Sequence, residues 1–299
     1  MKKGITKILS ACVFAFVVFL AAGTQSKAAV NMGVKQTGAG SSYVDLAWDA
    51  QLGAGHYHTQ FSQDGKNWID MDNSSSPSES VYNLTQGASY YARVVAYKGS
   101  HYTGTHVMIG VSETAIVSTK PTEVSGLTQT AAGVNSVSMS WNASAGAASY
   151  VIYGYINYNW TQIGTSATNS ATITGVAATT STRFSVAAVK NVTGGTVTGD
   201  QCSGVEMKAI PIKVSRIAMQ YYWDVLKEAK YIWTDVNNAD GYQYEVKSAN
   251  GKKTYFRATS TNSSTYVKPF PRGIFVKARV RAYVTVGNKV YYGAWSPYT

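Results

Sequence analysis

The stretch VKARVRAY, Val276 to Tyr283, carries cations at a spacing that could bind an anionic ligand. Small or apolar residues alternate in it with Lys277, Arg279 and Arg281. Strict alternation is typical of a half-buried β-strand, so we expect these cations on one outer face, with Lys247 of a neighbouring strand beside them. Several cations on one face can bind a polyanion, because the contact releases counterions. In the alternative interpretation they only keep an exposed strand solvated and prevent edge association.

The histidines are a second group that could do chemistry. All four fall in the first third of the chain, at His56, His58, His101 and His106. We expect His56 and His58 to point outward from one strand, and the other two to lie in a loop at the same end of the fold. Imidazole is a common zinc ligand, but a metal site needs distances correct to about 0.2 Å. The pattern favours four separate surface histidines over a metal site.

A third group consists of aromatic residues in YVIYGYINYNW. Tyr153 and Tyr155 face outward if Tyr150 and Ile152 point inward, and Trp160 follows at the end of the strand. Exposed rings in a row can stack on the apolar faces of sugars. The alternative is that the tyrosines pack across neighbouring strands and stabilise the sheet.

Motifs that would indicate catalysis are missing from the sequence. We find no Gly-rich phosphate loop between a strand and a helix, no nucleophile elbow and no Cys or His spacing of a structural zinc site. The 15 acidic residues are scattered over the whole chain. The sequence therefore predicts a protein that is not an enzyme and needs no cofactor.

The elements that position these residues repeat along the chain. Trp48, Trp141 and Trp233 are spaced 93 and 92 residues apart, and each ends a short alternating strand. A turn and a Tyr-rich strand follow each Trp, and Ser112, Ser203 and Ser296 are expected to open the last strand of each copy. Short alternating strands with Gly, Asn, Ser and Pro turns, without helical periodicity, predict antiparallel β-sandwiches.

These features resemble fibronectin type III domains, in which a Trp on the second strand is buried and a Leu six residues before a Tyr forms a tyrosine corner. Leu84 and Tyr90 match that corner, whereas the other copies have Val176 with Thr182 and Phe270 with Val276, and lack the hydroxyl. The resemblance implies an all-β chain of three tandem immunoglobulin-like antiparallel β-sandwiches. We place the domains at residues 29–120, 121–211 and 212–299, with short Pro-containing junctions that predict a semi-rigid string.

The first 28 residues have the pattern of a signal peptide, with basic residues, an apolar run from Ala11 to Ala22 and small residues up to Ala28. The run is too short to span a bilayer, which needs about 20 apolar residues. The mature chain keeps one cysteine, Cys202, and so cannot form an internal disulfide. We expect a secreted or cell-surface protein of bacterial type, without a membrane span in the mature chain.

Charge is concentrated in the third copy, where 14 basic residues face 5 acidic ones, against 5 and 7 in the first copy and 3 and 3 in the second. This copy also ends soon after Ser296, so its last strand is expected to be short, with an edge that a partner strand could complete.

The leading prediction is a non-catalytic adhesion protein or binding scaffold whose third domain holds an anionic polymer. The alternatives are a structural spacer without a ligand, or a carbohydrate-binding accessory to secreted glycosidases. The expected partners are an anionic or neutral cell-surface polysaccharide or another surface protein. Nucleic acid is not expected, because no binding motif is present.

Overall fold

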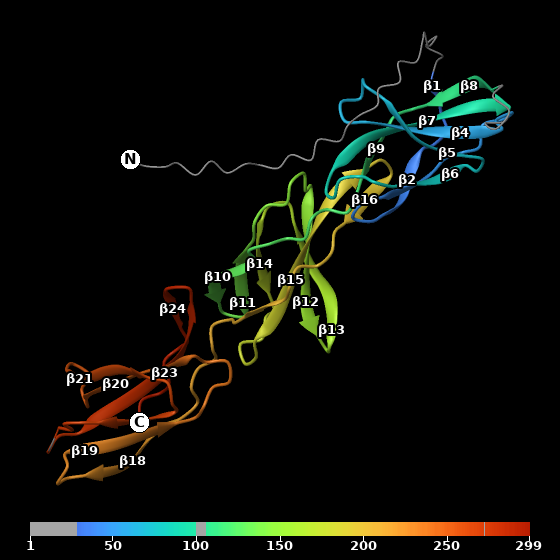
Figure 1. The fold of residues 1–299 in the computed structure, drawn as a ribbon. Coiled ribbons are helices and arrows are strands. Elements are labelled where there is room, and N and C mark those ends of the chain that lie inside the picture. The colour runs from blue at the N-terminus through green and yellow to red at the C-terminus, as the bar shows by residue number, and fades with distance from the viewer. Residues whose placement is uncertain (1–28, 100–105, 272) are drawn as a thin grey trace, which may run out of the picture.

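The chain forms three β-sandwiches that follow one another along a line (Figure 1). The computed structural model describes residues 29–99, 106–271 and 273–299, so the predicted signal peptide lies outside the described residues. All regular elements in the described ranges are strands. The predicted class, three tandem immunoglobulin-like antiparallel β-sandwiches, is confirmed.

The first sandwich packs a three-stranded sheet against a six-stranded one. The smaller sheet consists of β2 (Lys35–Ala39), β3 (Val44–Ala47) and β6 (Ser78–Val81). The larger consists, in order, of β1 (Ala29–Val30), β8 (His106–Ser112), β7 (Ser89–Gly99), β4 (His56–Ser62) and β5 (Ile69–Ser74), with β9 (Ala115–Ser118) also paired to β7. Within this sandwich β1 and β8 run parallel, and the other pairs are antiparallel.

The second and third sandwiches repeat this plan. The second has β10 (Thr128–Gly133), β11 (Ser136–Ser140) and β14 (Ser170–Thr174) in one sheet; the other has β13 (Asn159–Ser166), β12 (Ser149–Ile156), β15 (Thr182–Val192) and β16 (Gly195–Thr198), with β17 (Val205–Met207) on β15. The third has β18 (Ile217–Trp223), β19 (Glu228–Trp233) and β22 (Ser264–Val267) in one sheet, and β21 (Thr254–Ser260), β20 (Gly241–Ser248), β23 (Val276–Val286) and β24 (Lys289–Tyr292) in the other.

Each sandwich has its own core, built around one Trp. The indole rings meet a Tyr of the following strand edge to face, in the pairs Trp48–Tyr57, Trp141–Tyr150 and Trp233–Tyr242, with ring centroids 5.4, 5.3 and 5.5 Å apart. The three core clusters share no residue. The predicted domain boundaries fall in segments without an assigned strand, 119–127 and 208–216. The Trp repeat in the sequence is therefore the repeat of the core.

Tyrosine hydroxyls fasten loops onto these cores. The Thr85 N–H donates to the Tyr90 hydroxyl at 3.0 Å, which is the expected tyrosine corner of the first domain. A second hydroxyl contact occurs in all three domains: backbone N–H groups six residues earlier donate to Tyr57, Tyr150 and Tyr242 at 3.0, 3.0 and 2.8 Å. The second and third domains thus lack the corner but keep this other link.

The start of the last strand differs from the prediction: Ser112 ends β8 instead of opening β9, Ser296 lies in no assigned strand, and in the second domain the equivalent residue is not a serine. The Val94 N–H donates to Ser112 Oγ at 2.8 Å, and the Val280 N–H donates to Ser296 Oγ at 3.0 Å. In the second domain the Val186 N–H instead meets Cys202 Sγ at 3.3 Å. The equivalent of Ser112 is therefore Cys202 and not Ser203, and its buried thiol replaces the hydroxyl as acceptor.

Residues 293–299 of the third domain contain no assigned strand but run alongside β23. The N–H groups of Gly293, Ser296 and Thr299 donate to the carbonyls of β23 residues 282, 280 and 278, at 2.8, 2.8 and 3.0 Å. The same chain therefore occupies these three carbonyls, with which a partner strand could otherwise have paired.

The first and second domains contact each other through a hairpin. Thr193, in the turn between β15 and β16, exchanges two hydrogen bonds with Ile116 of β9, at 2.8 and 2.7 Å. The buried Lys190 ammonium donates to the Gly87 carbonyl, and Lys120 pairs with Asp200 at 2.7 Å. These contacts fix the hairpin of the second domain against the first.

The second and third domains meet in a similar way. Lys208 pairs with Asp240 at 2.7 Å, and the Tyr291 hydroxyl of β24 donates to the Thr130 carbonyl of β10 at 3.5 Å. Gly293 lies against the junction proline: a Cβ added there would come within 2.7 Å of the Pro211 carbonyl oxygen. Both junctions thus combine a hairpin contact with an ion pair, which restrains the string.

Candidate functional site

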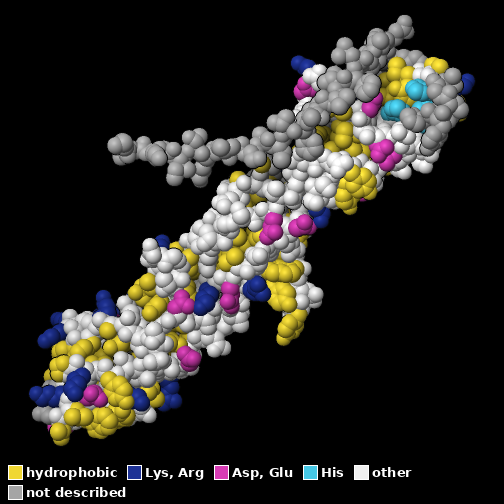
Figure 2. Space-filling view, in the orientation of Figure 1, with side chains coloured by type: hydrophobic (Ala, Val, Ile, Leu, Met, Phe, Trp, Pro, Cys, Tyr) yellow, Lys and Arg dark blue, Asp and Glu magenta, His cyan; other side chains and the backbone are white. Residues whose placement is uncertain are grey.

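The cations of VKARVRAY lie on the outer face of β23. Lys277, Arg279 and Arg281 are partly exposed, while the alternating Ala278 and Val280 are fully buried in the core. Lys and Arg side chains gather over this third sandwich in Figure 2. The structure therefore brings the three cations to one surface, as alternation along a strand requires.

Neighbouring strands add further charges to this surface in register. Lys247 of β20 stands directly opposite Lys277, and Glu245 stands opposite both Arg279 of β23 and Arg257 of β21. The five cations Lys247, Arg257, Lys277, Arg279 and Arg281 form what we call the cationic face. Glu245 is the one acidic residue in strands β20, β21 and β23.

Glu245 is completely buried beneath the cations. Its carboxylate accepts hydrogen bonds from Arg257 Nη2 and Arg279 Nε, both at 2.6 Å, and Lys247 Nζ lies 3.6 Å away. Burial alone would raise the pKa of Glu245, but the hydrogen bonds from Arg257 and Arg279 and the charges outweigh it and hold the pKa below its ordinary value. Glu245 therefore organises the face as a buried anion.

Aromatic rings of the C-terminal segment interleave with these cations. Arg281 lies over the rings of Tyr292 and Trp295 at 3.8 and 4.5 Å from their centroids. Arg279 lies over Trp295 and Tyr298 at 4.5 and 4.9 Å. Lys277 Nζ lies 4.5 Å from the Tyr298 ring centroid. This cation–aromatic ladder restricts the side chains in a way that isolated surface charges do not.

The sequence prediction missed the ladder. A signal for it was present, because the three aromatic residues recur at an interval of three residues. Their pairing with Arg279 and Arg281 depends on the path of residues 293–299 along β23, which the sequence pattern does not give. Arg281 also donates two hydrogen bonds to Gln243 Oε1, at 3.0 and 2.6 Å.

Three of the four histidines come together on the outer side of the larger sheet of the first domain, and His56 is buried there, so the expectation of four separate surface histidines is wrong. The ring centroids of His56, His58 and His106 lie 5.3 to 6.2 Å apart, and His56 stacks on Tyr97 at 5.2 Å. His56 Nδ1 also lies 3.1 Å from the Gly99 carbonyl oxygen. His101 lies outside the described residues. Within the described part of the chain, no group of three His, Cys, Asp or Glu side chains has a geometry that could hold a metal ion.

The aromatic residues of the second domain lie at the far end of the hairpin β12–β13. Tyr155 stands opposite Trp160, with ring centroids 5.3 Å apart and planes inclined by 62°. Both rings are more than one-third exposed, while Tyr153 is half-buried. Trp160 rests on Gly204, where an added Cβ would come within 2.7 Å of the indole. Tyr155 and Trp160 thus form an edge-to-face pair.

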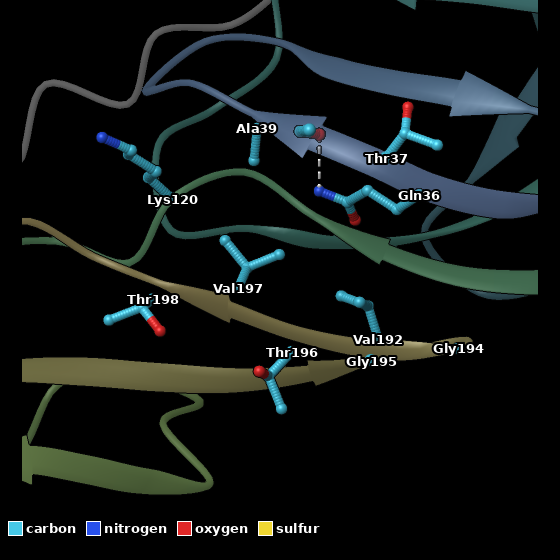
Figure 3. Close-up of a pocket in the computed structure, with 11 residues that line it drawn as sticks. Gln36, Thr37, Ala39, Lys120, Val192, Gly194, Gly195, Thr196, Val197 and Thr198 are labelled. Carbon is cyan, nitrogen blue, oxygen red and sulfur yellow. Dashed lines mark hydrogen bonds between the residues drawn. The ribbon is translucent and has the colours of Figure 1, made fainter.

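A cleft of about 370 Å³ separates the first two domains. It runs between β2 and the hairpin β15–β16 and is lined by Gly, Thr and aliphatic side chains together with Gln36 and Lys120 (Figure 3). Gln36 Nε2 donates to the Gly38 carbonyl within the cleft wall. Lys120 is the only charged side chain among these lining residues, so they bring no acid and base together.

Comparisons with known proteins find structural likeness only. No protein-family model matches the sequence, and no curated protein matches it. A crystal structure of the FN1–FN3 domains of chicken CNTN1 is similar over 90% of this chain and 96% of that chain, with 16% identity and a TM-score of 0.36. A segment of two fibronectin type III domains from chicken tenascin is similar over 59% of this chain and 97% of that chain, with 17% identity and a TM-score of 0.31.

The described residues also bear on membrane association. Within residues 29–99, 106–271 and 273–299, no helix has the length and apolar character that crossing a bilayer would require.

Proposed function

We propose that this chain is a non-catalytic, secreted or surface-held binding scaffold whose third domain holds an anionic polymer on the cationic face. The observation that carries the proposal is the pair Lys247 and Lys277, which stand directly opposite each other on β20 and β23. Like charges opposite each other on one sheet face destabilise the sheet. The Glu245 carboxylate, 3.6 Å from Lys247 Nζ, offsets part of this repulsion, and a bound polyanion would remove the rest, so the pair favours a ligand over a purely structural role.

The charge balance of the face supports the same proposal. Glu245 pairs with three of the five cations, Lys247, Arg257 and Arg279, so the face keeps an excess of positive charge after its internal ion pairs. The Arg257 side chain is 55% exposed. The ladder holds Lys277 and both β23 arginines in place, which lowers the entropy lost when a ligand binds. A cell-surface polysaccharide with anionic groups has the required multivalent charge.

Retention of the chain from Ala29 to Thr299 on immobilised heparin and on a purified teichoic-type polymer, across a salt series, tests this proposal. The informative variant is Lys247→Ser with Lys277→Ser, because it leaves Arg257 and Arg279 bound to Glu245. Loss of two cations should move elution to lower salt and reduce the salt dependence of binding by about 1.4 to 1.8 released counterions. The matched control is Lys66→Ser with Lys98→Ser in the first domain, which should elute with the unchanged chain.

The outcome also separates the alternatives. Elution of the Lys247/Lys277 variant together with the unchanged chain, on both polymers, would overturn the proposal and leave a structural spacer. Thermal unfolding of both double variants at a temperature no lower than that of the unchanged chain shows that a loss of retention comes from binding and not from unfolding.

The carbohydrate-binding alternative has one favourable observation, the exposed pair Tyr155 and Trp160. It predicts retention on a neutral glucan that Tyr155→Ala with Trp160→Ala abolishes, whatever the charge of the third domain. Retention that survives this change would count against it.

A further inference from the structure

The smaller sheet of the third domain carries aromatic rings on its outer face. Tyr221 and Trp223 belong to β18, and Tyr266 belongs to β22. Lys230 of the central strand β19 stands opposite Tyr221 on one side and Tyr266 on the other. Tyr266 is 52% exposed and Trp223 is 47% exposed. We call Tyr221, Trp223, Lys230 and Tyr266 the aromatic platform.

The platform is an ordered array of rings. The Tyr221 hydroxyl donates to the Tyr266 hydroxyl at 3.0 Å across Lys230, and the two ring centroids are 6.4 Å apart. The Trp223 ring centroid lies 4.5 Å from that of Tyr221. Lys230 Nζ lies 5.7 and 5.5 Å from the centroids of Tyr221 and Tyr266. One ammonium is thus held beside two phenol rings, within a row of three rings that crosses the sheet.

The other two domains show that the fold does not need these rings. The first strand of the smaller sheet has a β-bulge in all three domains. The first paired residue after the bulge is Tyr221 in the third domain, Gly38 in the first and Ala131 in the second, so these three residues are equivalent. At the position of Lys230 and Tyr266, the first domain has Asp45 bonded to Ser80 at 2.6 Å, and the second has Ser138 bonded to Thr172 at 2.8 Å. Trp223 corresponds to Gly40 and Gly133.

The core of the sandwich is complete without these rings. Inward-facing neighbours such as Tyr231, Ala229 and Val267 already fill the core and are almost completely buried. Half-exposed aromatic rings on a surface cost solvation without filling the core, and such groups mark binding sites. At the four platform positions the sister domains have Gly, Ala and short polar residues, although the first domain carries a separate ring pair, Tyr43 and Tyr82, next to the ends of β3 and β6.

We propose that the aromatic platform binds the pyranose rings of a carboxylated polysaccharide. Sugar rings have apolar faces that can cover Trp223 and Tyr266, while the phenol hydroxyls can bond to sugar hydroxyls at the rim. Lys230 offers the cation for a uronate carboxylate between the stacked rings. This site is separate from the cationic face, which lies on the other sheet of the domain.

Binding of the chain from Ala29 to Thr299 to polygalacturonate oligosaccharides, measured by titration calorimetry, tests the proposal. Trp223→Ala with Tyr266→Ala should weaken binding by about tenfold or more, because both stacking surfaces are lost. Lys230→Gln should weaken binding to polygalacturonate but leave binding to its methyl ester, which lacks the charge. Tyr266→Phe should retain most of the affinity because it keeps the ring.

The matched control is Tyr43→Ala with Tyr82→Ala, which removes a pair of rings from the first domain and should leave the affinity unchanged. The Lys247→Ser, Lys277→Ser variant separates this site from the cationic face, since it should keep its binding to the methyl ester. Equal affinity of the Trp223/Tyr266 variant and the unchanged chain for both oligosaccharides would overturn the proposal. So would the absence of any binding by the unchanged chain.

Discussion

The carboxylate of Glu245 lies 2.6 Å from Nε of Arg279, in a position that solvent does not reach. The same guanidinium lies over the rings of Trp295 and Tyr298. Arg279 is therefore bound from two sides, by a buried anion on β20 and by aromatic rings of the C-terminal segment. Through Arg279, the ionised state of Glu245 therefore contributes to the stability of the third domain.

Acid should destabilise the third domain through Glu245. Its pKa is held below the ordinary value of 4.5, so the ionised carboxylate contributes its full stabilisation above that pH. The contribution is lost as the pH falls from about 4.5 toward the lowered pKa. We expect the free energy of unfolding of this domain to fall over that range, as measured by hydrogen exchange of peptides from β20 and β23.

Glu245→Gln separates this effect from other acid effects. The variant should be less stable at pH 7 by about 3 kcal/mol, because three cations lose a buried counterion. It should also lose part of the acid sensitivity of β20 and β23. Glu123→Gln, at an exposed position of the second domain, is the control. Identical acid sensitivity of Glu245→Gln and the unchanged chain would contradict the role given to this carboxylate.

Removal of the Tyr242 hydroxyl should destabilise the third domain more than the same change destabilises its sisters. The Val236 N–H that donates to Tyr242 is buried, whereas the N–H groups that meet Tyr57 and Tyr150 are partly exposed to water. An unpaired buried donor costs about 1–3 kcal/mol. We expect the Tyr→Phe loss in unfolding free energy to be largest at Tyr242, measured by exchange in each domain separately. An equal loss at all three tyrosines would argue against solvent access as the cause.

The spacing of the Trp residues predicted the three cores, because each core Trp ends a strand whose alternation is visible in the local sequence. Trp48, Trp141 and Trp233 each end an alternating strand, and alternation places the cations of β23 outside without further information. The first domain shows the corner of Leu84 and Tyr90 as expected. These features can be predicted because they depend only on residues that are close in the sequence.

Features that depend on pairing between strands could not be predicted in this way. Strict alternation in IAMQYYW would put Ile217, Met219 and Tyr221 on one face. The bulge between Met219 and Tyr221 shifts the register by one residue and turns Tyr221 and Trp223 to the outside. The partners of Glu245 likewise follow from the register of β20 with β21 and β23.

The equivalence of Cys202 with Ser112 and Ser296 gives a further prediction. Because Cys202 Sγ accepts from the Val186 N–H as Ser112 and Ser296 do elsewhere, Cys202→Ser should preserve this bond and cost less than about 1 kcal/mol. Cys202→Ala should cost more, because Val186 N–H loses its side-chain acceptor inside the core. Urea unfolding of both variants checks this order. A serine variant less stable than the alanine variant would contradict the assigned equivalence.

A side chain at Gly293 should loosen the junction between the second and third domains. Gly293→Ala places a Cβ within 2.7 Å of the Pro211 carbonyl, closer than packed atoms allow, and the backbone on either side must move apart. The ion pair Lys208–Asp240 then loses its geometry. Spin labels on the second and third domains should show a broader distance distribution in the variant. Gly195→Ala, where nothing lies within 4 Å of an added Cβ, should leave the distribution unchanged. An unchanged distribution for Gly293→Ala would show that this contact does not restrain the string, and that its stiffness comes from the ion pair and the hairpin contact of Tyr291 with Thr130.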